Sequence, residues 1–253
     1  MSAPVLWQFR ASHFNEKARW ALDWKGVQHV RRSLLPGWHV PRIVALTWQT
    51  QVPVLELDGG QAIADSTQII AHLEALHPHP PLYPDDGAAR RRALELEHYF
   101  DEELGPHIRR AFFFDALEHT DYMVGLFASG ERAITRSAYR TFFPLARMLM
   151  RTAMGIDAPR TERSREKVEE ALDRLEAEIG PSGYLVGDRF TVADLTAAAL
   201  LAPLLMPQQF PYPFPKPPDS VARLRAAYAS RPALAWAAEM YQRHRGDSAA
   251  VEA

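Results

Sequence analysis

The sequence of 253 residues contains no cysteine. This absence excludes disulfide bonds, thiolate metal sites and a cysteine nucleophile. Ten histidines remain, but none shows the HExxH spacing of a zinc site, and the "HPHP" pair lies in a proline-rich turn. We therefore expect no metal. A cytoplasmic location agrees best with a chain that has no disulfides.

Long apolar segments and blocks of like charge are also lacking. The longest apolar stretch, Leu195–Met206, is too short to span a bilayer and contains Pro203. The N-terminal segment has no basic region followed by an apolar run, so we expect no secretion signal and no membrane partner. The net charge is -2 with both signs interspersed, which argues against nucleic acid as a partner. The GxGxxG, Walker and GxSxG motifs do not occur.

What the chain does contain is a hydrophobic content of 47%, enough for a substantial core. Its first eighty residues alternate between strand and helix signals in the order β-α-β-(α)-β-β-α. Residues 14–26 and 65–77 have helical periodicity, and Asp58-Gly59-Gly60 indicates a hairpin between two short strands. An α/β domain over residues 1–79 follows from this pattern.

A different character begins after a proline-rich linker, which we place at residues 80–87. Residues 88–253 are predicted to be all-helical. Thr191 and Asp194 have the spacing of a capping box at the start of an apolar helix. The prolines concentrated in 203–218 predict an extended wall or lid instead of a helix.

Three segments in this order resemble the cytosolic glutathione transferase family: "VPVL", "ADSTQII" and "YLVGDRFTVADLTAAALL". The resemblance covers essentially the whole chain. It implies a thioredoxin-like N-terminal domain with a mixed four-stranded sheet and a cis-proline, followed by an all-α C-terminal helical bundle. It also implies glutathione as the co-substrate and a homodimer.

By this resemblance, glutathione binds along residues 52–66. Pro53 is expected to be cis, so that the backbone N–H and C=O of Val52 can pair with the tripeptide as an added strand would. The alternative is an ordinary proline of an edge strand. Ser66 is expected to hold the γ-glutamyl carboxylate at a helix N-terminus, and Asp65 its ammonium group. Asp65 alternatively serves only as a helix cap.

Two further residues are expected near the glycyl end of glutathione. His39 in "PGWHVP" lies where related classes place a histidine or lysine near the glycyl carboxylate. The alternative is a surface loop histidine. Gln51 precedes the Val-Pro pair and is expected to contact the same end through its amide.

At the reacting end, alignment of Lys17-x-Arg19 with serine- and cysteine-type members places Ser12 at the position that activates the thiol. A free thiol has a pKa near 8.5, so a hydroxyl that donates to sulfur would favour the thiolate. Ser12 alternatively acts only as an N-cap, and the neighbouring His13 and Asn15 are further candidates. Without cysteine the chain cannot form a mixed disulfide with glutathione.

The second substrate, a small electrophile, is expected against the first helices of the second domain. Tyr99, Glu103 and His107 are candidates, since their spacing places some of them on one helix face. Of the three aromatics Phe112–Phe114, we expect at most one to face the cleft. The segment from about 120 to 158 is expected to build a deep or covered pocket.

The predicted function is a glutathione transferase that activates the thiolate for attack on a fairly apolar electrophile. Transfer, isomerisation and dehalogenation are not distinguished at this level. The alternative is a non-catalytic binding or regulatory module that keeps the fold. Whether glutathione binds and whether it reacts would separate the two.

Overall fold

The structure, a computed structural model, describes residues 2–252. Its N-terminal part contains a four-stranded sheet with strand order β2-β1-β3-β4. β1 pairs in parallel with β2 and antiparallel with β3, and β3 pairs antiparallel with β4. The predicted mixed sheet is thereby confirmed. The strands are β1 (Val5–Gln8), β2 (Val30–Ser33), β3 (Val54–Glu56) and β4 (Ala62–Ala64).

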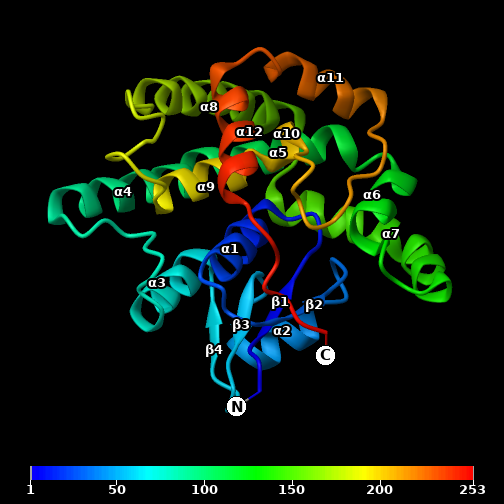
Figure 1. The fold of residues 1–253 in the computed structure, drawn as a ribbon. Helices are drawn as coiled ribbons and strands as arrows, with labels where there is room; N and C mark the ends of the chain where they lie inside the picture. The colour runs from blue at the N-terminus through cyan, green and yellow to red at the C-terminus, as the bar shows by residue number, and fades with distance from the viewer. Residues whose placement is uncertain (1, 253) are drawn as a thin grey trace.

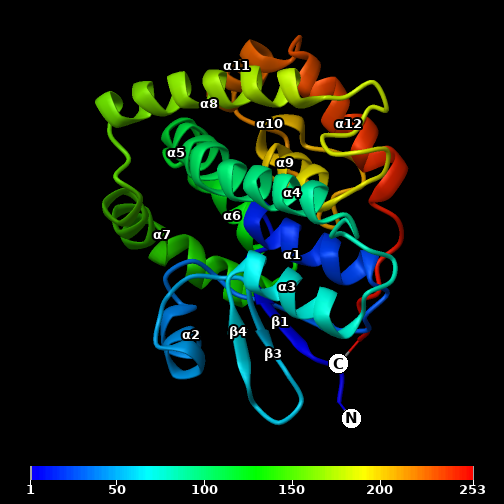
Figure 2. The same ribbon diagram turned by 90° about the vertical axis from the view of Figure 1, so that its left-hand side faces the viewer.

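Three helices accompany this sheet: α1 (His13–Trp24), α2 (Val40–Thr47) and α3 (Ser66–Leu76). α1 begins at the N-cap Ser12, and the next residue after its C-cap, Gly26, has a φ of 62°, a conformation that glycine adopts without strain. α1 and α3 contact each other beneath the helical part of the chain, while α2 contacts β4 on the other side of the sheet (Figure 2).

Helices make up the regular structure of the described residues beyond α3, as predicted (Figure 1). Residues 207–218 contain no helix, in agreement with their proline density; residues 208–212 form a turn and bends, and 213–218 have no regular structure. The elements are α4 (Gly87–Tyr99), a π-helical turn η1 (Phe100–Leu104), α5 (Gly105–Ala116), α6 (Thr120–Ala128), α7 (Ala133–Met154), α8 (Ala158–Glu178), α9 (Val192–Leu200), α10 (Ala202–Leu205), α11 (Asp219–Tyr228) and α12 (Pro232–His244).

The capping box at the start of α9 is present. Thr191 donates from its backbone N–H and its hydroxyl to one carboxylate oxygen of Asp194, both at 2.8 Å. The other oxygen accepts from the backbone N–H of Leu185 at 2.9 Å. Burial raises the pKa of Asp194 to about 6, although these hydrogen bonds oppose the shift. α9 is buried along its whole length and packs against α1.

The connection between the two parts is held at several points. Lys25 donates from Nζ to the carbonyl of Pro80 at 2.7 Å, and the N–H of Val192 donates to the carbonyl of Leu82 at 2.9 Å. The C-terminal tail returns from α12 to the edge of the sheet (Figure 1), where the N–H of Val251 donates to the carbonyl of His29. The linker and the C-terminal tail therefore both contact the first domain.

None of the helices within residues 2–252 is both long and apolar enough to cross a membrane.

Candidate functional site

Two neighbouring cavities lie where the N-terminal domain meets α5. The polar cleft, about 680 Å³, extends from the loop before β3 to the start of α3 and is closed by α4 and η1. The apolar cavity, about 530 Å³, lies between the end of β1, the loop before α2, and helices α5, α6 and α7. Both are lined by Phe14, Gln51, Val52 and Arg109, so these residues mark the boundary between them.

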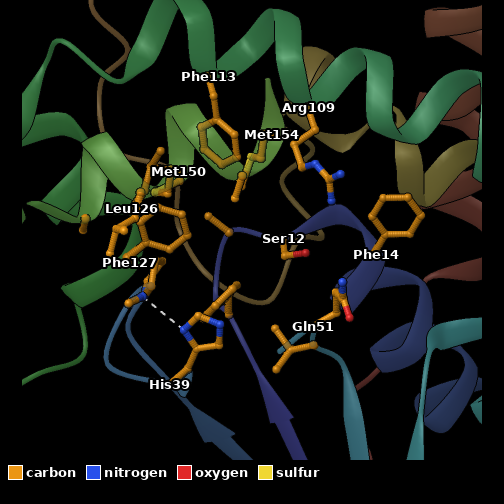
Figure 3. A pocket seen from close by; sticks show the side chains of 18 of the residues that line it. Ser12, Phe14, His39, Gln51, Arg109, Phe113, Leu126, Phe127, Met150 and Met154 are labelled. Carbon is orange, nitrogen blue, oxygen red and sulfur yellow. Dashed lines mark hydrogen bonds between the residues drawn. The ribbon is translucent and has the colours of Figure 1, made fainter. Parts of the chain in front are cut away.

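Ser12 lies beside this boundary, at the N-terminus of α1. Its Oγ accepts from the side-chain Nδ2 of Asn15 at 2.7 Å and from the backbone N–H of Asn15 at 3.4 Å. A serine hydroxyl has two acceptor positions and one donor proton. Because two donors already point at Oγ, its own proton is free for a ligand, and Figure 3 shows the hydroxyl directed into the cavity.

Asn15 and His13 have different surroundings. Asn15 is fully buried, its Oδ1 accepts from the N–H of Phe9 at 2.9 Å, and Nδ2 also reaches the carbonyl of Val52 at 3.2 Å. It therefore positions Ser12 and the Val52 loop. His13 is bound through Nε2 to the carbonyl of Gly105 at 3.1 Å, and burial, followed by the charge of Arg109, lowers its pKa to about 3. A neutral, buried His13 joins α1 to α5.

The Val52–Pro53 peptide bond is cis. The carbonyl of Val52 points back to Asn15, so only its second lone pair is open to a ligand. The N–H of Val52 donates to no group among residues 2–252. This partly buried donor lies on the wall shared by both cavities.

Asp65 and Ser66 form the tip of α3 in the polar cleft. One carboxylate oxygen of Asp65 accepts from the N–H groups of Thr67 and Gln68, at 2.8 and 3.4 Å, so the capping interpretation is correct. The φ of Asp65 is 78°, an unfavourable value for a side-chain-bearing residue. The second oxygen of Asp65 and the N–H of Ser66 hydrogen-bond to nothing within the described residues.

The far wall of the polar cleft contains a charge cluster that the sequence did not reveal. Lys17, fully buried, pairs with Glu97 at 2.8 Å and Asp101 at 2.5 Å, and donates to the hydroxyl of Thr67 at 2.8 Å. Burial opposes the charge of Lys17, but the two carboxylates raise its pKa overall. The cluster joins α1, α3 and η1, elements that lie far apart along the chain.

His39 and Gln51 both line the apolar cavity. His39 Nδ1 accepts from the N–H of Gly37 at 3.1 Å and Nε2 contacts the carbonyl of Thr50 at 3.0 Å, so both ring nitrogens are used by the backbone. Burial lowers the pKa of His39, which disfavours an ion pair with a carboxylate. Gln51 has an exposed side chain directed toward the space below Arg109 (Figure 3).

The structure places Tyr99, Glu103 and His107 elsewhere than predicted. Glu103 pairs with Lys167 of α8 at 3.5 Å, and His107 Nδ1 contacts the hydroxyl of Ser164 of α8 at 3.0 Å. The charges that act on Tyr99 also come from Glu103 and α8. This side of the helix faces α8, so Tyr99, Glu103 and His107 do not line the apolar cavity. The opposite side of the helix, which carries Arg109, faces the cavity.

The apolar cavity is lined by aromatic and aliphatic side chains from several helices. Phe112 and Phe113 both line it, which corrects the expectation of at most one, because the cavity is wider than one row of a helix. Phe114 lies away from it, near Arg165. α6 and α7, which arise from the segment predicted to build a pocket, supply Leu126, Phe127, Ala146, Leu149, Met150 and Met154, and the proline-rich segment supplies Phe214.

No group of three or more histidine, aspartate or glutamate side chains suited to a metal ion occurs within the described part of the chain.

Comparison with known proteins identifies two family models. "Glutathione S-transferase, N-terminal domain" matches residues 6–81, and "Glutathione S-transferase, C-terminal domain" matches residues 158–238. None of the curated protein sequences matches this chain.

Solved structures share the fold over nearly the whole chain. A glutathione S-transferase from Methylobacterium radiotolerans, crystallised in complex with glutathione sulfonate, is 26% identical over 92% of each chain, with a TM-score of 0.55. A glutathione S-transferase from Xanthobacter autotrophicus is 19% identical over 95% of this chain and 93% of its own, with a TM-score of 0.63. The beta-etherase LigF from Sphingobium is 19% identical over 94% and 99%, with a TM-score of 0.63.

Proposed function

Because the chain belongs to the glutathione S-transferase family, we propose that it binds glutathione in the polar cleft and transfers its sulfur to an electrophile in the apolar cavity. The observation that carries this proposal is the hydrogen bonding of Ser12. Its oxygen accepts two hydrogen bonds from Asn15, and the hydroxyl lies beside the boundary between the two cavities, where it can donate to a ligand.

The groups that line the polar cleft suit a zwitterionic tripeptide. The open N–H of Val52 would pair with the cysteinyl backbone, as in an added strand. The tip of α3 offers the N–H of Ser66 to a carboxylate, and the second oxygen of Asp65 lies beside it for an ammonium group. The similar Methylobacterium protein was crystallised in complex with glutathione sulfonate, which supports a glutathione-type ligand for this chain.

Ser12 would act on the thiol. Its O–H donates to the thiolate, and the N-terminus of α1 adds a partial positive charge. Each pH unit by which the thiol pKa falls corresponds to about 1.4 kcal/mol of preference for the anion. The thiolate then forms the S–C bond while the electrophile releases its leaving group or accepts a proton after addition.

Ser12→Ala tests the catalytic role. We expect the pKa of bound glutathione, followed by thiolate ultraviolet absorbance, to return toward about 8.5, and kcat/KM at neutral pH to fall roughly tenfold or more. Ser12→Asp serves as the matched control, because aspartate keeps the N-cap but presents a negative charge to the thiolate. An unchanged thiol pKa in Ser12→Ala would remove Ser12 from the mechanism.

The alternative of a non-catalytic binding module makes a different prediction. Glutathione at one hundred times its Kd should then still stabilise the protein by about 2.7 kcal/mol, but no electrophile should react. Thermal melting with and without glutathione, combined with a turnover assay, separates these outcomes. A melting temperature that glutathione leaves unchanged would contradict both.

A further inference from the structure

Arg109 projects from α5 to the boundary of the two cavities, where its guanidinium points down toward Ser12 and Gln51 (Figure 3). It forms neither an ion pair nor a hydrogen bond with any group of residues 2–252. Its contact is with the ring of Phe14, whose centroid lies 5.7 Å from the guanidinium carbon. Burial lowers the pKa of Arg109, and the neighbouring Arg110 adds to this effect.

Several buried cations of this protein have carboxylate partners. Lys17 pairs with Glu97 and Asp101, Lys25 with Glu74, and Arg245 with Glu16 and Asp23. The adjacent Arg110 donates to the carbonyl of Met154 and the hydroxyl of Ser164. A partly buried guanidinium without such partners is costly, which makes it a candidate for ligand binding.

The acidic side chains of the polar cleft do not neutralise Arg109. Glu97 and Asp101 are already engaged by Lys17. Asp65 caps α3, and neither Asp65 nor Glu102 forms an ion pair with Arg109 within the described residues. On the other side, the cavity that Arg109 enters is bounded by Phe113, Phe127, Met150 and Met154. An anionic group carried on an aromatic or aliphatic body would therefore satisfy the charge and fill the cavity at once.

We propose that Arg109 selects a second substrate with an anionic group, a carboxylate or sulfonate, attached to an apolar and preferably aromatic body. The role of Arg109 in catalysis rests on the proposed transferase function. The binding of the anion by Arg109 can be measured without turnover. The anion lies at Arg109, next to Ser12, and the apolar body extends toward α6 and α7.

Two fluorescent dyes provide a test that is independent of glutathione. The probe 8-anilinonaphthalene-1-sulfonate and its neutral analogue N-phenyl-1-naphthylamine differ by the sulfonate. For Arg109→Met we expect the Kd of the sulfonate to rise about 10- to 150-fold, the range for a charge-assisted hydrogen bond. The Kd of the neutral dye should change by less than about threefold. Arg109→Lys should lie between wild type and Arg109→Met, because lysine keeps the charge but loses the bidentate geometry.

Arg147→Met is the matched control, because Arg147 pairs with Glu118 outside the cavity and its loss should leave both dyes unaffected. Equal weakening of both dyes by Arg109→Met would indicate a structural role and overturn the proposal. Unchanged binding of the sulfonate would overturn it as well.

An activity assay links the site to the reaction. The pair 4-chloro-3,5-dinitrobenzoate and 4-chloro-3,5-dinitrobenzamide both react by loss of chloride to a thiolate and differ in charge. With each rate divided by the uncatalysed rate, Arg109→Met should lower kcat/KM about 10- to 150-fold for the acid and leave the amide and the KM of glutathione nearly unchanged. A raised KM for glutathione with the acid preference retained would assign Arg109 to the tripeptide and overturn the proposal.

Failure of the two proposals can be told apart. If neither compound reacts but the dyes respond to Arg109→Met as described, the transferase assignment fails and the anion site stands. If both compounds react and the charge preference is absent, the transferase assignment stands and the anion site fails.

Discussion

The polar cleft and the apolar cavity adjoin each other but are built in different ways. One wall of the polar cleft comes from a single stretch, residues 49–67, and offers backbone donors, a helix tip and Asp65; the opposite wall comes from α4, η1 and α5. The apolar cavity draws side chains from β1, the loop before α2, and helices α5, α6, α7 and α10. The first offers main-chain donors on one wall, and the second is lined almost entirely by side chains.

If the proposed function is correct, this difference divides recognition between the two substrates. Changes in the polar cleft should act on glutathione and leave the preference among electrophiles intact. Changes in the apolar cavity should do the reverse. Ser12 and Arg109 lie at the boundary, where the two ligands would meet. Substitutions in either cavity can therefore test whether recognition of the two substrates is separate.

The largest effect is expected for Asp65. Asp65→Ala removes both the cap of α3 and the carboxylate next to Ser66, so we expect the KM of glutathione to rise roughly 30-fold, as for loss of a charge-assisted hydrogen bond. Helix capping should cost about 1 kcal/mol of unfolding free energy in addition. Steady-state kinetics and urea unfolding measure the two effects.

Asp65→Asn separates them, because asparagine caps a helix as well as aspartate but carries no charge. The unfolding free energy should stay near that of wild type while the KM of glutathione still rises. A wild-type KM in this variant would show that Asp65 contributes only as a cap. A changed preference among electrophiles would contradict the division between the two cavities.

A comparable effect, on stability, is expected at His13, which joins the two domains beneath both cavities. Its pKa is about 3 in the folded protein, against an ordinary value of 6.5. The unfolded chain therefore takes up the proton first, and stability that is complete above pH 6.5 is lost as the pH falls toward 3. Between pH 7 and pH 5 this loss amounts to about 2 kcal/mol.

His13→Gln should flatten that pH dependence by the same amount, since glutamine can donate to the carbonyl of Gly105 but does not titrate in this range. Urea unfolding of both proteins at pH 7 and pH 5 measures the difference. Parallel losses in wild type and variant would show that His13 has the same pKa in the folded protein as in the unfolded chain.

The smallest effect is expected for Phe113 in the apolar cavity. Phe113→Ala removes one ring from a wall of several, so we expect the KM of an aromatic electrophile to rise about fivefold, as for loss of one aromatic contact. The KM of glutathione should not change. Phe114→Ala, one residue further along the same helix and facing Arg165, should affect neither KM. An equal effect of both variants would indicate a change in α5 instead of in the cavity wall.

Prediction from the sequence succeeded where the signal is local. The capping box of Thr191 and Asp194, the cap at Asp65 and the absence of helix in residues 207–218 depend on residues a few positions apart, and each is found in the structure. The second-substrate side was predicted less well. Tyr99, Glu103 and His107 share a helix face, but spacing cannot tell which face packs on α8.

Arg109 was missed for a related reason. In the sequence it belongs to "IRRAFFF" and is indistinguishable from Arg110, which hydrogen-bonds to Met154 and Ser164. A rotation of about 100° per residue around the helix sends one arginine to the α7–α8 side and the other into the boundary of the two cavities. The one signal in the sequence was a pair of adjacent arginines before an aromatic run. On a helix with one buried face, two adjacent side chains are not equally exposed to water.

The sequence alone therefore determined the two-part architecture, the hairpin at residues 58–60 and the cap of α3, because turns, caps and short strand pairings arise between residues that are close along the chain. Only the tertiary structure decided which side chains line the apolar cavity, that Asn15 reaches the carbonyl of Val52, and that Arg109 has no carboxylate partner within the described chain. These properties depend on distances between segments up to two hundred residues apart, which the packing of α5, α6 and α7 against the sheet sets.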